Sequence, residues 1–182
     1  MPALILVTDE TRLADPLPAL DRLPPGAGVL LRHYSCANRP GLARALARAA
    51  RRRRVALLVG GGDWRLAAAV GADGVHLPET LARTLADPGL RLWLRRGHVL
   101  SVAAHSRAAL ARAAGLGADA ALLSPVFPTA SHPGAPTLGA TRFALWARAA
   151  RLPVVALGGV NGRTARALRC AAGCAAIGGL LG

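Results

Sequence analysis

The stretch "VLSVAAHSRAALARAAGLGADAALLSPV", Val99 to Val126, decides the fold of this chain. It opens and closes with short apolar runs, each of a length typical of a buried strand. Between them lies an Ala-, Leu- and Arg-rich segment with helical spacing, which begins at the N-cap residue Ser106 and stops at Gly115. Strand, helix and strand in this order predict two parallel strands joined by a crossover helix.

The same alternation continues in both directions. Apolar runs predict strands at residues 4–8, 28–34, 55–60, 74–77, 99–104, 120–126, 154–159 and 175–179. Helical patterns lie at 15–22, 40–53, 64–70, 79–95, 106–115, 140–150 and 162–170. This predicts an α/β fold, a short (β/α)₈ TIM barrel in one domain over residues 1–182, with its eighth helix missing or truncated. The alternative is an open doubly wound sheet, but no GxGxxG motif opens a helix after the first strand.

The composition of the chain bears on its cellular location. No apolar run approaches the ~18–20 residues needed to cross a membrane, and the N-terminus lacks the basic start of a signal peptide. The three cysteines, Cys36, Cys170 and Cys174, contain no CxxC pair and fit reduced thiols better than disulfides. We therefore expect a cytoplasmic protein that does not bind a membrane.

The net charge of +14 comes entirely from arginine, because the chain contains no lysine. Such a charge is typical of nucleic-acid binding. However, aromatic residues are few, no binding motif is present, and the run Arg51–Arg54 ends a predicted helix, whose negative end it would stabilise. We expect no nucleic-acid partner. Any anionic ligand must be held by Arg, by His or by backbone N–H groups.

Functional residues of such barrels follow the carboxyl ends of the strands. The longest segment there is "SPVFPTASHPGAPTLG", residues 124–139, and glycine pairs follow the last two strands in "LGGVNG" (157–162) and "IGGLLG" (177–182). Glycine lets backbone N–H groups approach a phosphate closely, so these two turns predict a phosphate site. His76, within a strand, and His105, beside the Ser106 cap, are expected to be structural. Arg32 and Tyr34 should share the side of their strand that His33 does not face.

Five motifs in sequence order resemble the thiamine phosphate synthase family and its relative, the thiazole tautomerase. They are "LVTD" (6–9), "GADGVHL" (71–77), "SVAAHS" (101–106), "GADAALLSPVFPTASHPG" (117–134) and "PVVALGGVN" (153–161). The resemblance implies a (β/α)₈ barrel of thiamin biosynthesis. Its synthase members join a pyrimidine methyl diphosphate to a thiazole phosphate, with Mg²⁺ on the diphosphate.

The resemblance also implies catalytic residues. Arg32 is all that remains of the family's second-strand motif Gln-x-Arg-x-Lys. In the loop at 124–139, Thr129 and Ser131 keep the family's two hydroxyls, and His132 replaces its Lys. We predict these four residues as the catalytic set.

The phosphate side of the family site is kept better than the metal side. Gly158 and Gly159 match the family's glycines, and Ile177 with Gly178 stand where the family has Ile-Ser, so these four are the predicted phosphate-binding residues. The family's two metal-binding aspartates are absent. Asp63 and Glu79 are the nearest carboxylates, and we predict them as the ligands of a Mg²⁺ cofactor.

The implied function is a transferase acting on a thiazole phosphate and a pyrimidine diphosphate. One alternative is a metal-free isomerase of the tautomerase type. The position of the catalytic histidine of the tautomerases is occupied by Pro125 here, so His132 would transfer the proton instead. Another alternative is an inactive phosphate-binding or regulatory protein. The missing eighth helix would leave an apolar edge that a second copy could cover, so we expect a homodimer.

Overall fold

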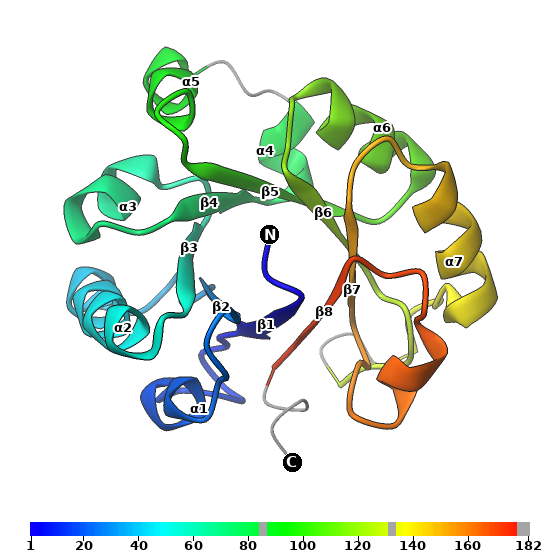
Figure 1. Cartoon of the computed structure of the whole chain (residues 1–182), viewed down its shortest axis with the longest axis horizontal. Helices are drawn as coiled ribbons and strands as arrows, with labels where there is room; N and C mark the ends of the chain where they lie inside the picture. Colours follow the sequence, from blue (N-terminus) through cyan, green and yellow to red (C-terminus); the bar gives the residue numbers. More distant parts are fainter. Residues whose placement is uncertain (84–86, 131–133, 178–182) are drawn as a thin grey trace.

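Eight parallel strands close into a barrel in the computed structural model, which describes residues 1–83, 87–130 and 134–177. Each strand pairs with its neighbours in sequence, and β1 also pairs with β8 (Figure 1). The strands are β1 (Leu4–Val7), β2 (Gly28–Leu31), β3 (Ala56–Gly60), β4 (Gly74–Leu77), β5 (Val99–Ala104), β6 (Ala120–Leu123), β7 (Val154–Leu157) and β8 (Gly173–Ala176). The predicted (β/α)₈ barrel is therefore confirmed, and the open sheet is excluded.

Helices surround this barrel on the outside (Figure 1). They are α1 (Leu17–Asp21), α2 (Arg39–Arg53), α3 (Trp64–Val70), α4 (Glu79–Arg83), α5 (Pro88–Leu94), α6 (Arg107–Gly115), α7 (Gly139–Ala149) and a 3₁₀ turn, η1 (Thr164–Ala167). The segment where an eighth helix would follow β8, residues 178–182, lies outside the described residues. None of the helices in the described ranges is long and apolar enough to cross a membrane.

Several predicted elements differ from the structure. The strands predicted at 28–34 and 120–126 end earlier, at Leu31 and Leu123. The helix predicted at 79–95 is two helices, because Asp87 caps a new start by accepting hydrogen bonds from Gly89 N and Leu90 N. The helix predicted at 162–170 is only the turn η1, followed by further three-residue turns such as Ala171 N to Leu168 O. The last strand begins two residues before its predicted start at 175, at Gly173, where a Cβ would lie 2.6 Å from the carbonyl oxygen of Ala3, just before β1.

The core has two layers, as alternation along strands buried on both faces requires. Small and branched side chains fill the barrel itself: Ile5, Val7, Leu30, Leu58, Ala120, Leu122, Val155 and Ala175. The intervening residues of the same strands pack outward against the helices, together with alanines such as Ala43 and Ala47 of α2. The core therefore consists mainly of Ala, Leu and Val, in agreement with the low aromatic content of the chain.

Two Gly-Ala-Asp turns support the amino-terminal end of the barrel. Asp73, before β4, accepts a hydrogen bond from Leu57 N at 2.7 Å, and Asp119, before β6, accepts one from Leu100 N at 2.8 Å. Each carboxylate therefore ties the start of its strand to the preceding strand. The functional site is expected at the opposite end of the barrel, where the carboxyl ends of the strands lie.

Candidate active site

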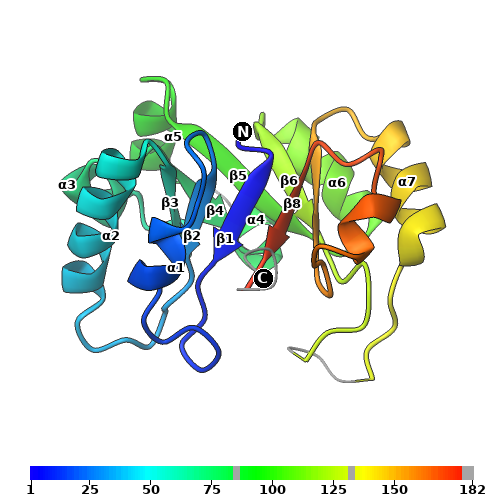
Figure 2. The ribbon, with the colours of Figure 1, turned by 60° about the horizontal axis from the view of Figure 1, so that its bottom comes forward.

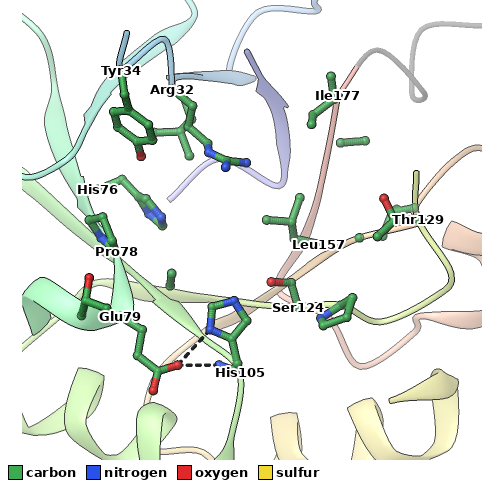
Figure 3. Close-up of a pocket in the computed structure, with 18 of the residues that line it drawn as sticks. Arg32, Tyr34, His76, Pro78, Glu79, His105, Ser124, Thr129, Leu157 and Ile177 are labelled. Atoms are coloured by element: carbon green, nitrogen blue, oxygen red, sulfur yellow. Dashed lines mark hydrogen bonds and ion pairs between the residues drawn. The ribbon is translucent and has the colours of Figure 1, made fainter. Parts of the chain in front are cut away.

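A cavity of about 680 Å³ opens at the carboxyl ends of the strands. This is the end of the barrel beyond which the connection between β6 and α7 extends (Figure 2). Its floor is apolar, with Leu30, Ala103, Leu157, Ala176 and Ile177, and polar side chains stand around it (Figure 3). A floor of this kind suits a heterocyclic ring, and the polar rim would orient it.

The end of β2 contributes Arg32 and Tyr34, and both line the cavity. Between them His33 is buried and faces away, with Nδ1 2.8 Å from Thr8 Oγ1. Thr8 Oγ1 also accepts a hydrogen bond from the backbone N–H of Arg32 at 2.9 Å. The predicted alternation of these side chains is therefore observed, and buried Thr8 and His33 fix the backbone that carries Arg32.

The guanidinium of Arg32 points into the cavity (Figure 3). Among the described residues it has no hydrogen-bond or ion-pair partner, although the side chain is half-buried. Next to it lies His76, whose Nδ1 is 2.9 Å from Ser101 Oγ. Burial, together with the positive charge of Arg32, lowers the pKa of His76 to about 3. His76 is packed and hydrogen-bonded as expected, and it lines the cavity as a neutral ring.

The loop after β3 contains Gly61 and Gly62, which have φ of 81° and 68°. The resemblance places one of the family's metal-binding aspartates here. A Cβ at Gly61 would lie 3.3 Å from Cε1 of Tyr34, and one at Gly62 would lie 2.6 Å from Cδ2 of Leu77. The loop packs closely against Tyr34 and Leu77, and its positive φ values disfavour a carboxylate-bearing residue at either position.

The residues predicted to bind Mg²⁺ do not fit that role. Asp63 does not line the cavity; it caps α3 by accepting from Leu66 N, and it pairs with Arg39 at 2.8 Å. Glu79 lines the cavity, but its carboxylate already pairs with two arginines and a histidine. The described part of the chain contains no group of three or more His, Cys, Asp or Glu side chains that could hold a metal ion.

The β6–β8 side of the cavity carries Thr129, Gly158, Gly159 and Ile177. A Cβ at Gly158 would lie 2.9 Å from Cα of Pro125, and one at Gly159 would lie 2.4 Å from Pro128 O. Both glycines, which have positive φ, are thus required for the close packing of the loop after β6 against β7. Of the other predicted residues, Ser131, His132 and Gly178 lie outside the described residues.

Sequence reasoning gave no functional role to three residues that line the cavity: Arg12, Arg83 and His105. Asp9 accepts hydrogen bonds from Arg12 through both the backbone and the guanidinium, and the Arg12 guanidinium holds the pKa of Asp9 well below its usual range despite partial burial. For Arg12 the sequence "DETR" (9–12) indicated such a turn, because Asp side chains readily accept hydrogen bonds from backbone N–H groups two and three residues later.

The fold and the site define a (β/α)₈ barrel with a cationic, partly apolar pocket, the class of barrel that binds small anionic ligands. The model of the family described as thiamine monophosphate synthase matches residues 4–180. The chain belongs to this family.

Similar proteins agree with this. The thiamine-phosphate synthase of Methylobacillus flagellatus is 39% identical over 100 residues, which are 54% of this chain and 46% of that protein. The thiamine biosynthesis bifunctional protein ThiM/ThiE of Symbiobacterium thermophilum is 39% identical over 150 residues, 77% of this chain and 29% of that protein. The matches thus span about half the length of the curated relatives, or less.

A solved structure shows the same fold. Thiamine phosphate pyrophosphorylase from Pyrococcus furiosus superposes with a TM-score of 0.79 at 23% identity, covering 98% of this chain and 87% of that one. At this identity the likeness establishes the barrel, whereas the chemistry must be argued from the pocket.

Proposed function

We propose that this protein joins a pyrimidine methyl diphosphate to a thiazole phosphate, forming thiamine phosphate and pyrophosphate. The observation that carries this proposal is the half-buried guanidinium of Arg32, which has no partner among the described residues and points into the cavity. A half-buried charge without a protein partner favours an anionic ligand, and arginine matches phosphate oxygens with paired donors.

The two sides of the cavity support two substrates. Arg32 and Arg83, with His105, stand on the β2–β5 side, where the diphosphate would bind. Thr129 and the glycine turn at Gly158 and Gly159 stand on the other side, where the thiazole phosphate would bind. The apolar floor between them would hold the two rings in contact and exclude water.

The reaction needs little proton transfer from the protein. The C–O bond to the diphosphate breaks, both electrons leave with the pyrophosphate, and the thiazole nitrogen captures the pyrimidine methyl cation. What the site must supply is stabilisation of the negative charge that develops on the leaving group. Arginine side chains can supply it, and the described residues contain no group of three or more His, Cys, Asp or Glu side chains that could hold a metal ion.

Incubating the protein with both substrates and analysing the products by chromatography tests this proposal. We expect thiamine phosphate and pyrophosphate in equal amounts. A rearranged thiazole phosphate, formed without the pyrimidine substrate, would replace the proposal with the isomerase alternative. Binding of thiazole phosphate by calorimetry without any product would replace it with the binding-protein alternative.

A further inference from the structure

Glu79 holds His105 in place at the β4–β5 side of the cavity. Glu79 is the first residue of α4, and its Oε2 lies 2.9 Å from His105 Nδ1 and accepts the backbone N–H of His105 at 3.1 Å (Figure 3). Its other oxygen, Oε1, accepts from Arg83 at 2.9 Å and from Arg112 at 2.8 Å. Both carboxylate oxygens of Glu79 therefore hold neighbouring side chains in place.

The carboxylate of Glu79 stays ionised in this arrangement. Burial alone would raise its pKa, but hydrogen bonds from Arg83 and His105 lower it below its usual range. Only 12% of its side chain is exposed, compared with 54% for His105. The carboxylate is thus an internal anchor, and the imidazole is the part of the pair that a ligand can reach.

The hydrogen bond to Glu79 decides which ring atom of His105 is presented. Since Nδ1 faces the carboxylate, Nε2 lies on the opposite side of the ring, which lines the cavity (Figure 3). In the described ranges Nε2 has no hydrogen-bond partner. Nε2 is therefore the ring nitrogen left for a ligand in the cavity.

This pair stands at the end of β4, where the resemblance places a metal-binding carboxylate. We propose that His105, oriented by Glu79, forms a hydrogen bond with the diphosphate of the substrate through Nε2, so that this chain binds diphosphate without a divalent cation. The proposal rests on the function proposed above. It assigns to His105 a ligand-binding role in place of the structural role expected from the sequence, and to Glu79 a positioning role in place of metal binding.

Calorimetric titration with inorganic pyrophosphate tests this directly. We expect the wild-type protein to bind pyrophosphate in excess EDTA, and His105→Ala to bind it about tenfold more weakly. The control is Arg107→Ala, which removes a positive charge two residues away on α6 but outside the cavity, and its affinity should match the wild type within about twofold. Wild-type binding that requires Mg²⁺, or unchanged affinity of His105→Ala, would overturn the proposal.

Glu79→Gln separates positioning from charge. Removal of a negative charge should by itself strengthen the binding of an anion. If Glu79 positions His105, the variant should instead bind pyrophosphate more weakly in EDTA, and tighter binding would contradict this role. Thermal unfolding of each variant checks that it is folded.

A spectrum of the wild-type protein adds a readout that does not depend on affinity. Pyrophosphate should shift the ¹⁵N resonance of one histidine ring, and a folded His105→Gln protein, in which this shift is absent, assigns it to His105. Unshifted histidine resonances at saturation would contradict the proposal. If thiamine phosphate forms only with Mg²⁺, the proposed function stands and this inference alone falls; if pyrophosphate binds under no condition, both fall.

Discussion

The positive charge of Arg32 affects the protonation of its neighbour His76. The guanidinium has no partner in the described part of the chain, and its field adds to burial in keeping His76 neutral. The backbone of Arg32 is held from below by Thr8, which itself contacts His33. The site thus keeps one strong positive charge in a fixed place and prevents a second one from forming beside it.

The depressed pKa of His76 predicts a pH dependence of stability. The unfolded chain takes up a proton near pH 6.5, whereas the folded chain does not until about pH 3, so stability is lost as the pH falls through this range. Between pH 7 and pH 5 the wild type should lose about 2 kcal/mol more free energy of unfolding than His76→Gln. Urea denaturation at both pH values measures this, and parallel losses in the two proteins would refute it.

At the scale of elements, periodicity predicted every strand, because the strands are short apolar runs between turns. Periodicity did not predict helix boundaries that are set by a single capping side chain. Asp87 starts α5 inside what looked like a single helix, and Asn161 accepts hydrogen bonds from Arg163 N and Thr164 N ahead of η1. Such side-chain bonds to the backbone depend on the local path of the chain, which spacing alone does not fix.

The end of α2 offers a test of helix termination. Arg54 has a left-handed backbone with φ of 54°, where glycine is favoured, and it follows the basic last turn predicted to stabilise the helix end. Arg54→Gly should raise the free energy of unfolding by about 1 kcal/mol. Arg52→Gly, within the same turn, should lower it by about 1 kcal/mol. Chemical denaturation measures both, and destabilisation by both changes would contradict the account of Arg54.

At the scale of the whole molecule, the barrel interior is a packed core rather than a channel. Leu58 of β3 is 1% exposed and packs in the cluster inside the barrel. Leu58→Ala should lower the free energy of unfolding by about 2–5 kcal/mol through lost burial and a cavity. The matched change Leu92→Ala, at a residue 58% exposed on α5, should cost less than about 0.5 kcal/mol. Equal effects in urea denaturation would contradict this packing.

The site could be predicted only in part from the sequence. Arg32 and Tyr34 follow from strand alternation, and the position of Thr129 follows from the barrel count. His105 was expected to be structural because it stands beside the Ser106 cap; its partner Glu79 lies 26 residues earlier, and the pairing of β4 with β5 brings the two together. The carboxylate predicted to bind Mg²⁺ also pairs with Arg83, one turn further along α4, and with Arg112 of α6. The homodimer remains a prediction, which light scattering can test.

The guanidinium of Arg32, which has no partner in residues 1–83, 87–130 and 134–177, is proposed to stabilise the diphosphate leaving group in this cavity. The most direct measurement is kcat/KM for thiamine phosphate formation in Arg32→Ala, compared with the wild type and with Arg65→Ala, an exposed arginine of α3 outside the cavity. We predict a loss of about 100-fold or more for Arg32→Ala and nearly unchanged activity for Arg65→Ala. Wild-type activity retained by a folded Arg32→Ala protein would contradict the account.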